Sequence, residues 1–339
     1  MMQGHPKSHE TGLRVEKAVL AVIPRSVRVG TPNHGNAADL TINGQPLTIK
    51  WIGEGRLGDA RRILGQRRGR PDIVVARRMS PGARHALSEA RVGWVDETGA
   101  AEIAIGSVIV SRTGMPARSD QRIKRWSPAV MAVAEALLCG VKATVSVTQS
   151  ATGLSAGSCT NALRFLSDQG LLAAGAKRGR GSGRRIKDEN ELLNAYAAAV
   201  EALPLPPALQ VGVTWRDPVA GLIEAGQRWN KAGVTWAATG AVAASVIAPY
   251  LTSVTHAAAY VDSDSIVGLE SVAGKAGLRP IEGGRLTLKP FPTAAVRALA
   301  KKVNGLNVAP WPRVYVDLLS EGVRGEEAAV HLLEVIRGR

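Results

Sequence analysis

The stretch from residue 144 to residue 187 constrains the fold more than any other part of this sequence. A short helix is expected at 145–152, where Gly153 stops it, and a longer helix follows at 156–169 after a Leu154-Ser155 turn. The apolar side chains of the longer helix recur at i, i+4 and i+7, which is the spacing of one helix face: Cys159, Leu163 and Leu166, with Ala162 on the flank. The pattern predicts a helix-turn-helix.

The opposite face of the longer helix carries small hydrogen-bonding side chains and one arginine. Such side chains suit a recognition helix that reads base edges in the major groove of DNA. The candidate DNA-binding residues of this helix are Ser155, Ser158, Thr160, Asn161 and Arg164.

A basic, glycine-rich run follows the two helices. After Gly170 the chain returns through Leu171-Leu172, turns at Gly179, Gly181 and Gly183, and continues to Lys187. This layout is typical of a winged helix, in which the wing lies beside the phosphate backbone or in a minor groove. The candidate phosphate contacts are Lys177, Arg178, Arg180, Arg184, Arg185 and Lys187.

One position departs from the helix-turn-helix pattern. Four residues before the turn glycine, where such motifs usually have a small alanine, this chain has Gln149. Either the two helices pack less tightly, or the register is displaced by one residue.

The charge distribution supports binding to a polyanion. The chain of 339 residues has 43 Lys and Arg against 28 Asp and Glu, and residues 121–200 hold 11 basic and only 5 acidic side chains. An ordinary helical hairpin with a solvated basic loop is the alternative. The joint occurrence of turn spacing, wing and basic block favours a sequence-specific protein that binds double-stranded DNA.

The fold class indicated is mixed α/β with several domains, because the length exceeds that of a single typical domain. We expect a small N-terminal α/β domain at 1–115, a winged helix-turn-helix domain at 122–203 and a C-terminal α/β domain at 208–339. The boundaries follow the polar linker at 112–126 and the prolines at 204, 206 and 207.

The N-terminal domain is expected to alternate strands and helices. Asn43-Gly44 between apolar runs predicts a hairpin, and Ser80-Pro81 predicts a helix start. The expected strands are 18–27, 39–42, 46–52, 72–76, 93–96 and 102–105, and the expected helices are 58–65 and 81–90.

The remaining helices and strands follow the same signals. The expected helices are 128–138 and 189–203 in the middle of the chain, and 218–229, 240–251, 293–302 and 324–336 beyond it. The expected strands are 257–261, 266–269, 285–288 and 314–316.

The sequence resembles the AbiEi family of type IV toxin–antitoxin antitoxins. Residues 127–187 are similar to the winged helix of that family, the segment RPDIVVARRMSPGARHALSEARVGWVDETGAAEI to the α/β part before it, and WAATGAVAASVIAPYL and RVYVDLLSEGVRGEEAAVHLLEVI to its C-terminal domain. The resemblance covers roughly residues 70–339.

The resemblance implies a transcriptional autorepressor that binds repeats in its own promoter. It also implies a functional partner, a nucleotidyltransferase toxin that the C-terminal domain neutralises without a tight complex. One recognition helix per chain, together with this resemblance, predicts binding to an inverted repeat as a homodimer or as two monomers.

Two enzyme readings are weaker. Asp39 and Thr48-Ile49-Lys50 faintly resemble a PD-(D/E)xK nuclease, but Thr48 stands at the second carboxylate position and Glu54 or Glu102 would have to replace it. Asp262 and Asp264, at the end of an expected strand that follows Thr239-Gly240, faintly resemble a nucleotidyltransferase metal pair. We expect no catalytic residues, no metal site and no cofactor. The alternatives kept are a metal-dependent DNA-processing nuclease and a plasmid or phage maintenance protein.

The two cysteines, Cys139 and Cys159, exclude a disulfide framework and indicate a reducing compartment. The apolar run 236–251 is too short to span a membrane. A cytoplasmic protein without membrane contact is therefore expected, and the Arg/Ala/Gly/Val-rich composition suits a bacterium.

Overall fold

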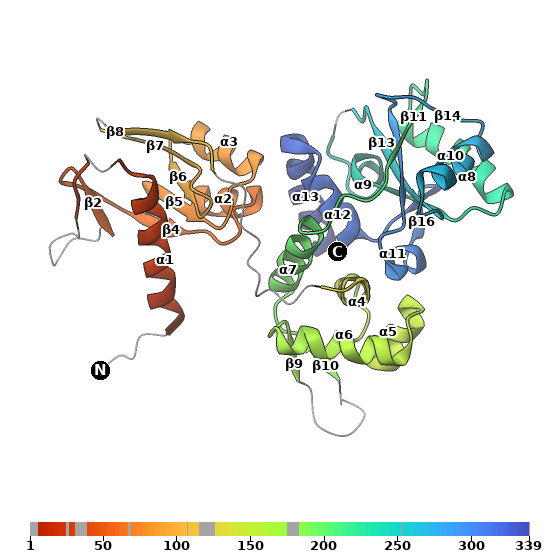
Figure 1. Cartoon of the computed structure of the whole chain (residues 1–339), viewed down its shortest axis with the longest axis horizontal. Helices are drawn as coiled ribbons and strands as arrows, with labels where there is room; N and C mark the ends of the chain where they lie inside the picture. The colour runs from red at the N-terminus through yellow and green to blue at the C-terminus, as the bar shows by residue number, and fades with distance from the viewer. Residues whose placement is uncertain are drawn as a thin grey trace. The chain divides into compact units, whose positions relative to one another are not determined.

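A computed structural model describes most of the chain (Figure 1). The described residues are 6–24, 27–30, 39–66, 69–106, 108–114, 126–174, 183–251 and 253–338. They form two compact units, residues 1–119 and residues 120–339. The chain is mixed α/β, as expected, with 13 helices and four sheets among the described residues.

The N-terminal unit holds three helices, a small antiparallel sheet β1-β2-β3 and a five-stranded sheet β4-β5-β6-β7-β8. The helices are α1 (Pro6–Val22), α2 (Leu57–Leu64) and α3 (Pro81–Glu89). The strands are β1 (Val29–Gly30), β2 (Leu40–Ile42), β3 (Gln45–Leu47), β4 (Ile49–Trp51), β5 (Ile73–Ala76), β6 (Gly93–Asp96), β7 (Ala101–Ile105) and β8 (Val108–Arg112).

The five-stranded sheet has an apolar core on each face. β4, β5 and β6 are parallel, and β7 and β8 continue the sheet antiparallel. Because side chains alternate along a strand, Ile73 and Val75 of β5 pack in the core with α1, whereas Val74 and Ala76 pack in the core with α2 and α3.

The strand expected at 18–27 is wrong, since residues up to Val22 form the end of helix α1. Ala18, Val19 and Val22 are buried together against the sheet. Packing of this helical face outweighs the β propensity of valine and isoleucine.

The hairpin expected around Asn43-Gly44 is confirmed. Both turn residues have positive φ, 50° and 81°, as a two-residue hairpin turn requires. Its second strand is shorter than expected: β3 ends at Leu47, and β4 begins the other sheet at Ile49. Strand β8 was not expected.

The C-terminal unit holds ten helices, a short hairpin and a seven-stranded sheet among its described residues. The helices are α4 (Pro128–Leu138), α5 (Val145–Thr152), α6 (Ala156–Asp168), α7 (Glu189–Glu201), α8 (Pro218–Lys231), α9 (Gly240–Ile247), α10 (Ile266–Lys275), α11 (Ala294–Ala298), α12 (Trp311–Leu319) and α13 (Gly322–Arg337). The hairpin strands are β9 (Leu172–Ala174) and β10 (Arg184–Ile186).

The seven-stranded sheet has the order β14-β11-β15-β13-β12-β17-β16. Helices α8 and α10 cover one face, and α9, α12 and α13 lie on the other side of the sheet (Figure 1). The strands are β11 (Leu209–Gly212), β12 (Trp236–Thr239), β13 (Ala257–Val261), β14 (Arg279–Pro280), β15 (Leu286–Pro290), β16 (Lys301–Val303) and β17 (Leu306–Val308).

Two strands expected in this unit are wrong. Residues 266–269 begin helix α10, whose N-cap Ser265 accepts a hydrogen bond from the Gly268 amide. Residues 314–316 lie inside helix α12, which has a proline in its first turn. Short β-branched runs do not distinguish a strand from a buried helix.

The helices at 126–201 and the seven-stranded sheet share one continuous hydrophobic core. Figure 1 shows α4, α5, α6 and the hairpin at the end of this unit that lies opposite β11 and β14. Within the described part of the chain, no helix has both the length and the apolar content needed to cross a membrane.

Candidate nucleic-acid interface

The turn between α5 and α6 is fixed by its backbone and by two caps. Gly153 ends α5 with φ of 71°, in the left-handed region that favours glycine, and its amide donates to the Gln149 carbonyl at 2.9 Å. Ser155 then caps α6 by accepting a hydrogen bond from the Ser158 amide at 3.2 Å. These two caps join the helices through only three residues, 153–155.

Helix α5 packs through threonines instead of the expected small residue at 149. Gln149 is exposed, whereas Thr148 and Thr152 are fully buried. Their hydroxyls donate to backbone carbonyls one turn earlier, Thr148 to Thr144 and Thr152 to Thr148. The buried contact position is therefore displaced by one residue, from 149 to 148.

The buried face of α6 is the one that the sequence predicts. Cys159, Ala162, Leu163 and Leu166 are buried, and α6 contacts both α4 and α5. Phe165 adds an edge-on contact to Trp126 at a ring-centroid distance of 6.1 Å. This packing fixes which side of α6 faces outward.

The outward side presents the predicted residues together. Thr160, Asn161 and Arg164 are exposed, and the Arg164 guanidinium donates to the Asn161 side-chain oxygen at 2.5 Å. Thr160 donates to the Ala156 carbonyl, and Ser155 is occupied as the cap. Arg164 and Asn161 thus form a preformed polar pair.

Two residues in the first turn of α6, Ala156 and Gly157, were not among those predicted from the sequence. Ala156 and Gly157 are exposed, and a Cβ added at Gly157 would meet no atom within 4 Å. A glycine on an exposed helix face allows another molecule to approach the backbone closely. Gly157 precedes Asn161 and Arg164 at helical spacing, so the sequence could have placed all three on one face.

A hollow of about 320 Å³ is lined by residues of α6 and of the start of α4. It is lined by Ser127, Ala129, Val130, Ser158, Asn161, Ala162 and Phe165. Ser158 therefore lies at its edge and is only half-buried.

The two strands at the ends of the predicted wing pair as an antiparallel hairpin. β9 and β10 pair from Leu172 with Ile186 to Ala174 with Arg184. Arg185 and Lys187 are exposed, whereas Arg184 is half-buried and donates from Nε to Ser167 of α6 at 2.9 Å. Lys177, Arg178 and Arg180 lie outside the described residues.

A buried carboxylate joins α4 to α7 and to the start of α11. Glu135 of α4 accepts hydrogen bonds from Tyr196 of α7, at 2.5 Å, and from Thr293, the N-cap of α11. Burial raises the pKa of Glu135 to about 7, against the opposing effect of the two hydrogen bonds.

The residues of the nuclease hypothesis are engaged elsewhere. Asp39 accepts from the Ile49 amide at 2.6 Å, and Lys50 donates to Gln66 at 3.0 Å. Glu54 pairs with Arg77, and Glu102 accepts from Ser88. Across the described ranges, no group of three or more His, Cys, Asp or Glu side chains is placed to hold a metal ion.

The carboxylates at 262 and 264 do not face the glycine that starts α9. β12 and β13 are antiparallel, with Trp236 opposite Val261 and Thr239 opposite Ala258. Asp262 therefore lies at the far end of β12 from Gly240, and its carboxylate forms an ion pair with Arg297 at 2.8 Å.

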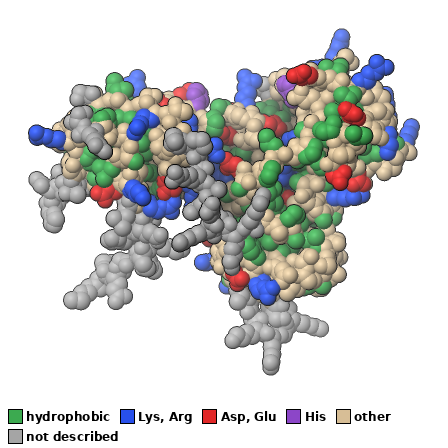
Figure 2. Space-filling view, in the orientation of Figure 1, with side chains coloured by type: hydrophobic (Ala, Val, Ile, Leu, Met, Phe, Trp, Pro, Cys, Tyr) green, Lys and Arg blue, Asp and Glu red, His purple; other side chains and the backbone are tan. Residues whose placement is uncertain are grey.

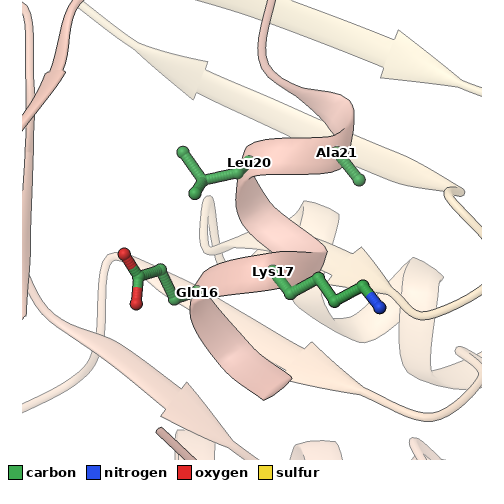
Figure 3. Close-up of a pocket in the computed structure, with 4 residues that line it drawn as sticks. All are labelled: Glu16, Lys17, Leu20 and Ala21. Carbon is green, nitrogen blue, oxygen red and sulfur yellow. The ribbon is translucent and has the colours of Figure 1, made fainter. Parts of the chain in front are cut away.

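A second hollow, of about 590 Å³, lies on helix α1 and is lined by Glu16, Lys17, Leu20 and Ala21 (Figure 3). One acid, one base and two apolar side chains on a single helix offer no convergent catalytic or ligand-binding chemistry.

Comparison of the sequence with protein-family models, with curated proteins and with solved structures gave no match.

Proposed function

We propose that this protein binds double-stranded DNA sequence-specifically through a winged helix formed by α4, α5, α6, the β9–β10 hairpin and α7. The observation that carries the proposal is the three-residue turn between α5 and α6, followed by an antiparallel hairpin with exposed cations. In this arrangement α6 enters the major groove and the hairpin lies along the phosphate backbone.

The exposed side chains of α6 have the chemistry that base reading needs. Arginine and asparagine read guanine and adenine edges through bidentate hydrogen bonds, and small residues in the first turn permit close approach and contact thymine methyl groups. Asn161 and Arg164 therefore serve as readers, and Gly157 as the point of closest approach.

The proposal extends to regulation by way of the resemblance. On that ground the protein is a transcriptional autorepressor of the AbiEi antitoxin type, cytoplasmic and bacterial, that binds an inverted repeat in its own promoter as a homodimer or as two monomers. Its functional partner is a nucleotidyltransferase toxin. No catalytic residue, metal or cofactor is part of this proposal.

Fluorescence anisotropy with the DNA upstream of the protein's own reading frame tests the DNA-binding part. Tighter binding to this DNA than to random duplex of equal length is expected, with footprinting that protects two half-sites one helical turn or a multiple apart. Equal affinities for the two DNAs would refute sequence-specific binding. The antitoxin part is tested by co-expression with the product of the neighbouring gene, where restored growth is expected.

A metal-dependent nuclease is the alternative that the sequence leaves open, although Asp39 and Lys50 are hydrogen-bonded to Ile49 and Gln66 and not to each other. Plasmid nicking in the presence of Mg²⁺ or Mn²⁺, abolished by Asp39→Ala, would support it. Intact plasmid under both metals would reject it and leave the DNA-binding proposal unaffected.

A further inference from the structure

The N-terminal unit carries a second long run of positive charge. Residues 50–78 hold nine Lys and Arg against three Asp and Glu, an excess of six in 29 positions, which equals the excess of the basic run at 177–187. Seven of the nine cations belong to the described residues: Lys50, Arg56, Arg61, Arg62, Arg70, Arg77 and Arg78. We call these seven the arginine face.

The fold gathers the arginine face around helix α2. Arg61 and Arg62 are exposed on α2 itself, and Lys50 of β4 reaches the end of α2 through Gln66 at 3.0 Å. Arg70 donates to the Leu64 carbonyl at 3.5 Å. Lys50, Arg61, Arg62 and Arg70 are thus exposed cations on or near the C-terminal end of α2.

The other end of α2 lies at the carboxyl ends of the parallel strands β4 and β5. The loops after these strands hold Arg56, Arg77 and Arg78, and their backbones are bonded to each other: the Arg77 amide donates to Gly53 at 2.9 Å and the Arg78 amide to Glu54 at 3.3 Å. This end of a parallel sheet is where α/β folds place their ligands.

Gly55 makes the contact between these loops possible. Its φ is 81°, and a Cβ at this position would lie 2.5 Å from the Arg78 carbonyl oxygen. No other residue fits there without moving the loop that carries Arg77 and Arg78. The arginines are therefore held on a rigid support, which lowers the entropy lost on binding.

The local carboxylates balance only part of this charge, three acids against nine cations. Asp59 pairs with Arg62 and Glu54 with Arg77, while Asp72 accepts from Thr48 at the opposite ends of the strands. Accumulated like charge destabilises a compact fold through self-repulsion, and a bound polyanion removes that cost. Six of the seven cations are arginines, whose planar fork matches phosphate geometry.

We infer that the arginine face is a second nucleic-acid contact, which binds the phosphate backbone of duplex DNA without reading its sequence. Helix α2 is about 12 Å long, and that length of duplex axis carries about seven phosphate charges. Figure 2 shows Lys and Arg side chains on the visible surface of the N-terminal unit. This contact does not depend on α6 being a recognition helix.

The test is a salt titration of the full-length chain on a random-sequence duplex. Arg61→Gln, Arg62→Gln and Arg70→Gln together should flatten the slope of log affinity against log salt by about 2–3 units. The matched control is Lys231→Gln, Lys275→Gln and Lys302→Gln, which removes three exposed charges from the C-terminal unit. The lysine triple Arg61→Lys, Arg62→Lys, Arg70→Lys keeps the charge and should keep most of the slope.

Three outcomes would overturn the inference. An unchanged slope in the glutamine triple, an equal loss in the control triple, or a loss seen with single-stranded RNA but not with duplex DNA would do so. Arg164→Ala, measured in parallel, separates the two proposals: a flattened slope with no effect of Arg164→Ala on sequence preference would remove the recognition-helix function and leave this contact standing.

Discussion

Tyr196 and Glu135 are 61 residues apart in the chain and meet in the interior, where the phenol donates a 2.5 Å hydrogen bond to the carboxylate. Thr293 donates to the other carboxylate oxygen. Three separate segments, α4, α7 and the start of α11, are thus joined by one fully buried acid.

The stability of the protein should depend on pH through Glu135. Its pKa is raised from 4.5 to about 7 by burial, while Arg313 lowers it and Asp317 raises it. The folded state therefore binds the proton more tightly, so the stabilisation is fully present below about pH 4.5 and is lost as pH rises through 7. The expected loss is up to about 3 kcal/mol.

Urea unfolding at pH 5.5 and pH 8 measures this effect. Glu135→Gln should remove the larger part of the pH dependence. Glu321, whose partly desolvated carboxyl also has a pKa raised to about 7, supplies a residual part that Glu321→Gln removes. Identical pH profiles for wild type and Glu135→Gln would contradict the assignment.

Arg164→Ala should lower the ratio of specific to random binding, because one bidentate base contact contributes about 1–3 kcal/mol. Competition anisotropy on both DNAs measures the ratio. Gln149→Ala is the matched control, since this side chain is exposed on the neighbouring helix α5. Equal losses on both DNAs would mean that Arg164 touches phosphate alone.

Gly157→Ala should raise the stability of the protein and lower its affinity for DNA. Alanine is more favourable than glycine inside a helix by about 1 kcal/mol, and the site has free space, so the free energy of unfolding should rise. DNA affinity should fall if this turn approaches the bases most closely. Thermal unfolding and anisotropy on the same preparation check both, and higher stability with unchanged affinity would place the turn outside the interface.

Gly153→Ala should destabilise the C-terminal unit. The substitution meets no atom within 4 Å, so the cost comes from the left-handed backbone alone and amounts to about 1–2 kcal/mol. Gly153→Asn should cost less, because asparagine tolerates this conformation better. Equal unfolding free energies for the two variants would indicate that the turn rearranges.

Arg185→Gln with Lys187→Gln should flatten the salt dependence of DNA binding by up to about 2 units, since each phosphate contact contributes about 0.9. Both side chains are exposed on or beside β10. Lys231→Gln with Lys275→Gln removes the same charge elsewhere in the unit. A slope equal to that of the control would leave the hairpin without an electrostatic role.

Local signals predicted several elements that a cap or turn residue marks, but not α10, whose N-cap Ser265 precedes a run expected as a strand. Asn43-Gly44, Ser80-Pro81 and Ser127-Pro128 each stand where the structure turns or starts a helix. The apolar periodicity predicted the buried face of α6 correctly, because Leu163 and Leu166 are buried and α6 packs against both α4 and α5.

Contacts between residues far apart in the chain could not be predicted from local sequence patterns. The helix at Val19 and the helix at Val314 are apolar and β-branched, so only the surfaces that bury them decide between strand and helix. The same holds for Thr148, whose displaced packing position depends on the hydroxyl finding a carbonyl one turn back. The partners of Glu135 are separated from it by 61 and 158 residues, and no local pattern could have paired them.

Because the helix block and the seven-stranded sheet share one hydrophobic core, this core limits how short an independently folding fragment can be. A fragment that stops at residue 203 would keep Glu135 and Tyr196 but lose Thr293, and would turn the apolar sides of α4 and α7 toward water. The block from α4 to α7 therefore needs to be expressed together with the sheet that follows it, within the compact unit of residues 120–339.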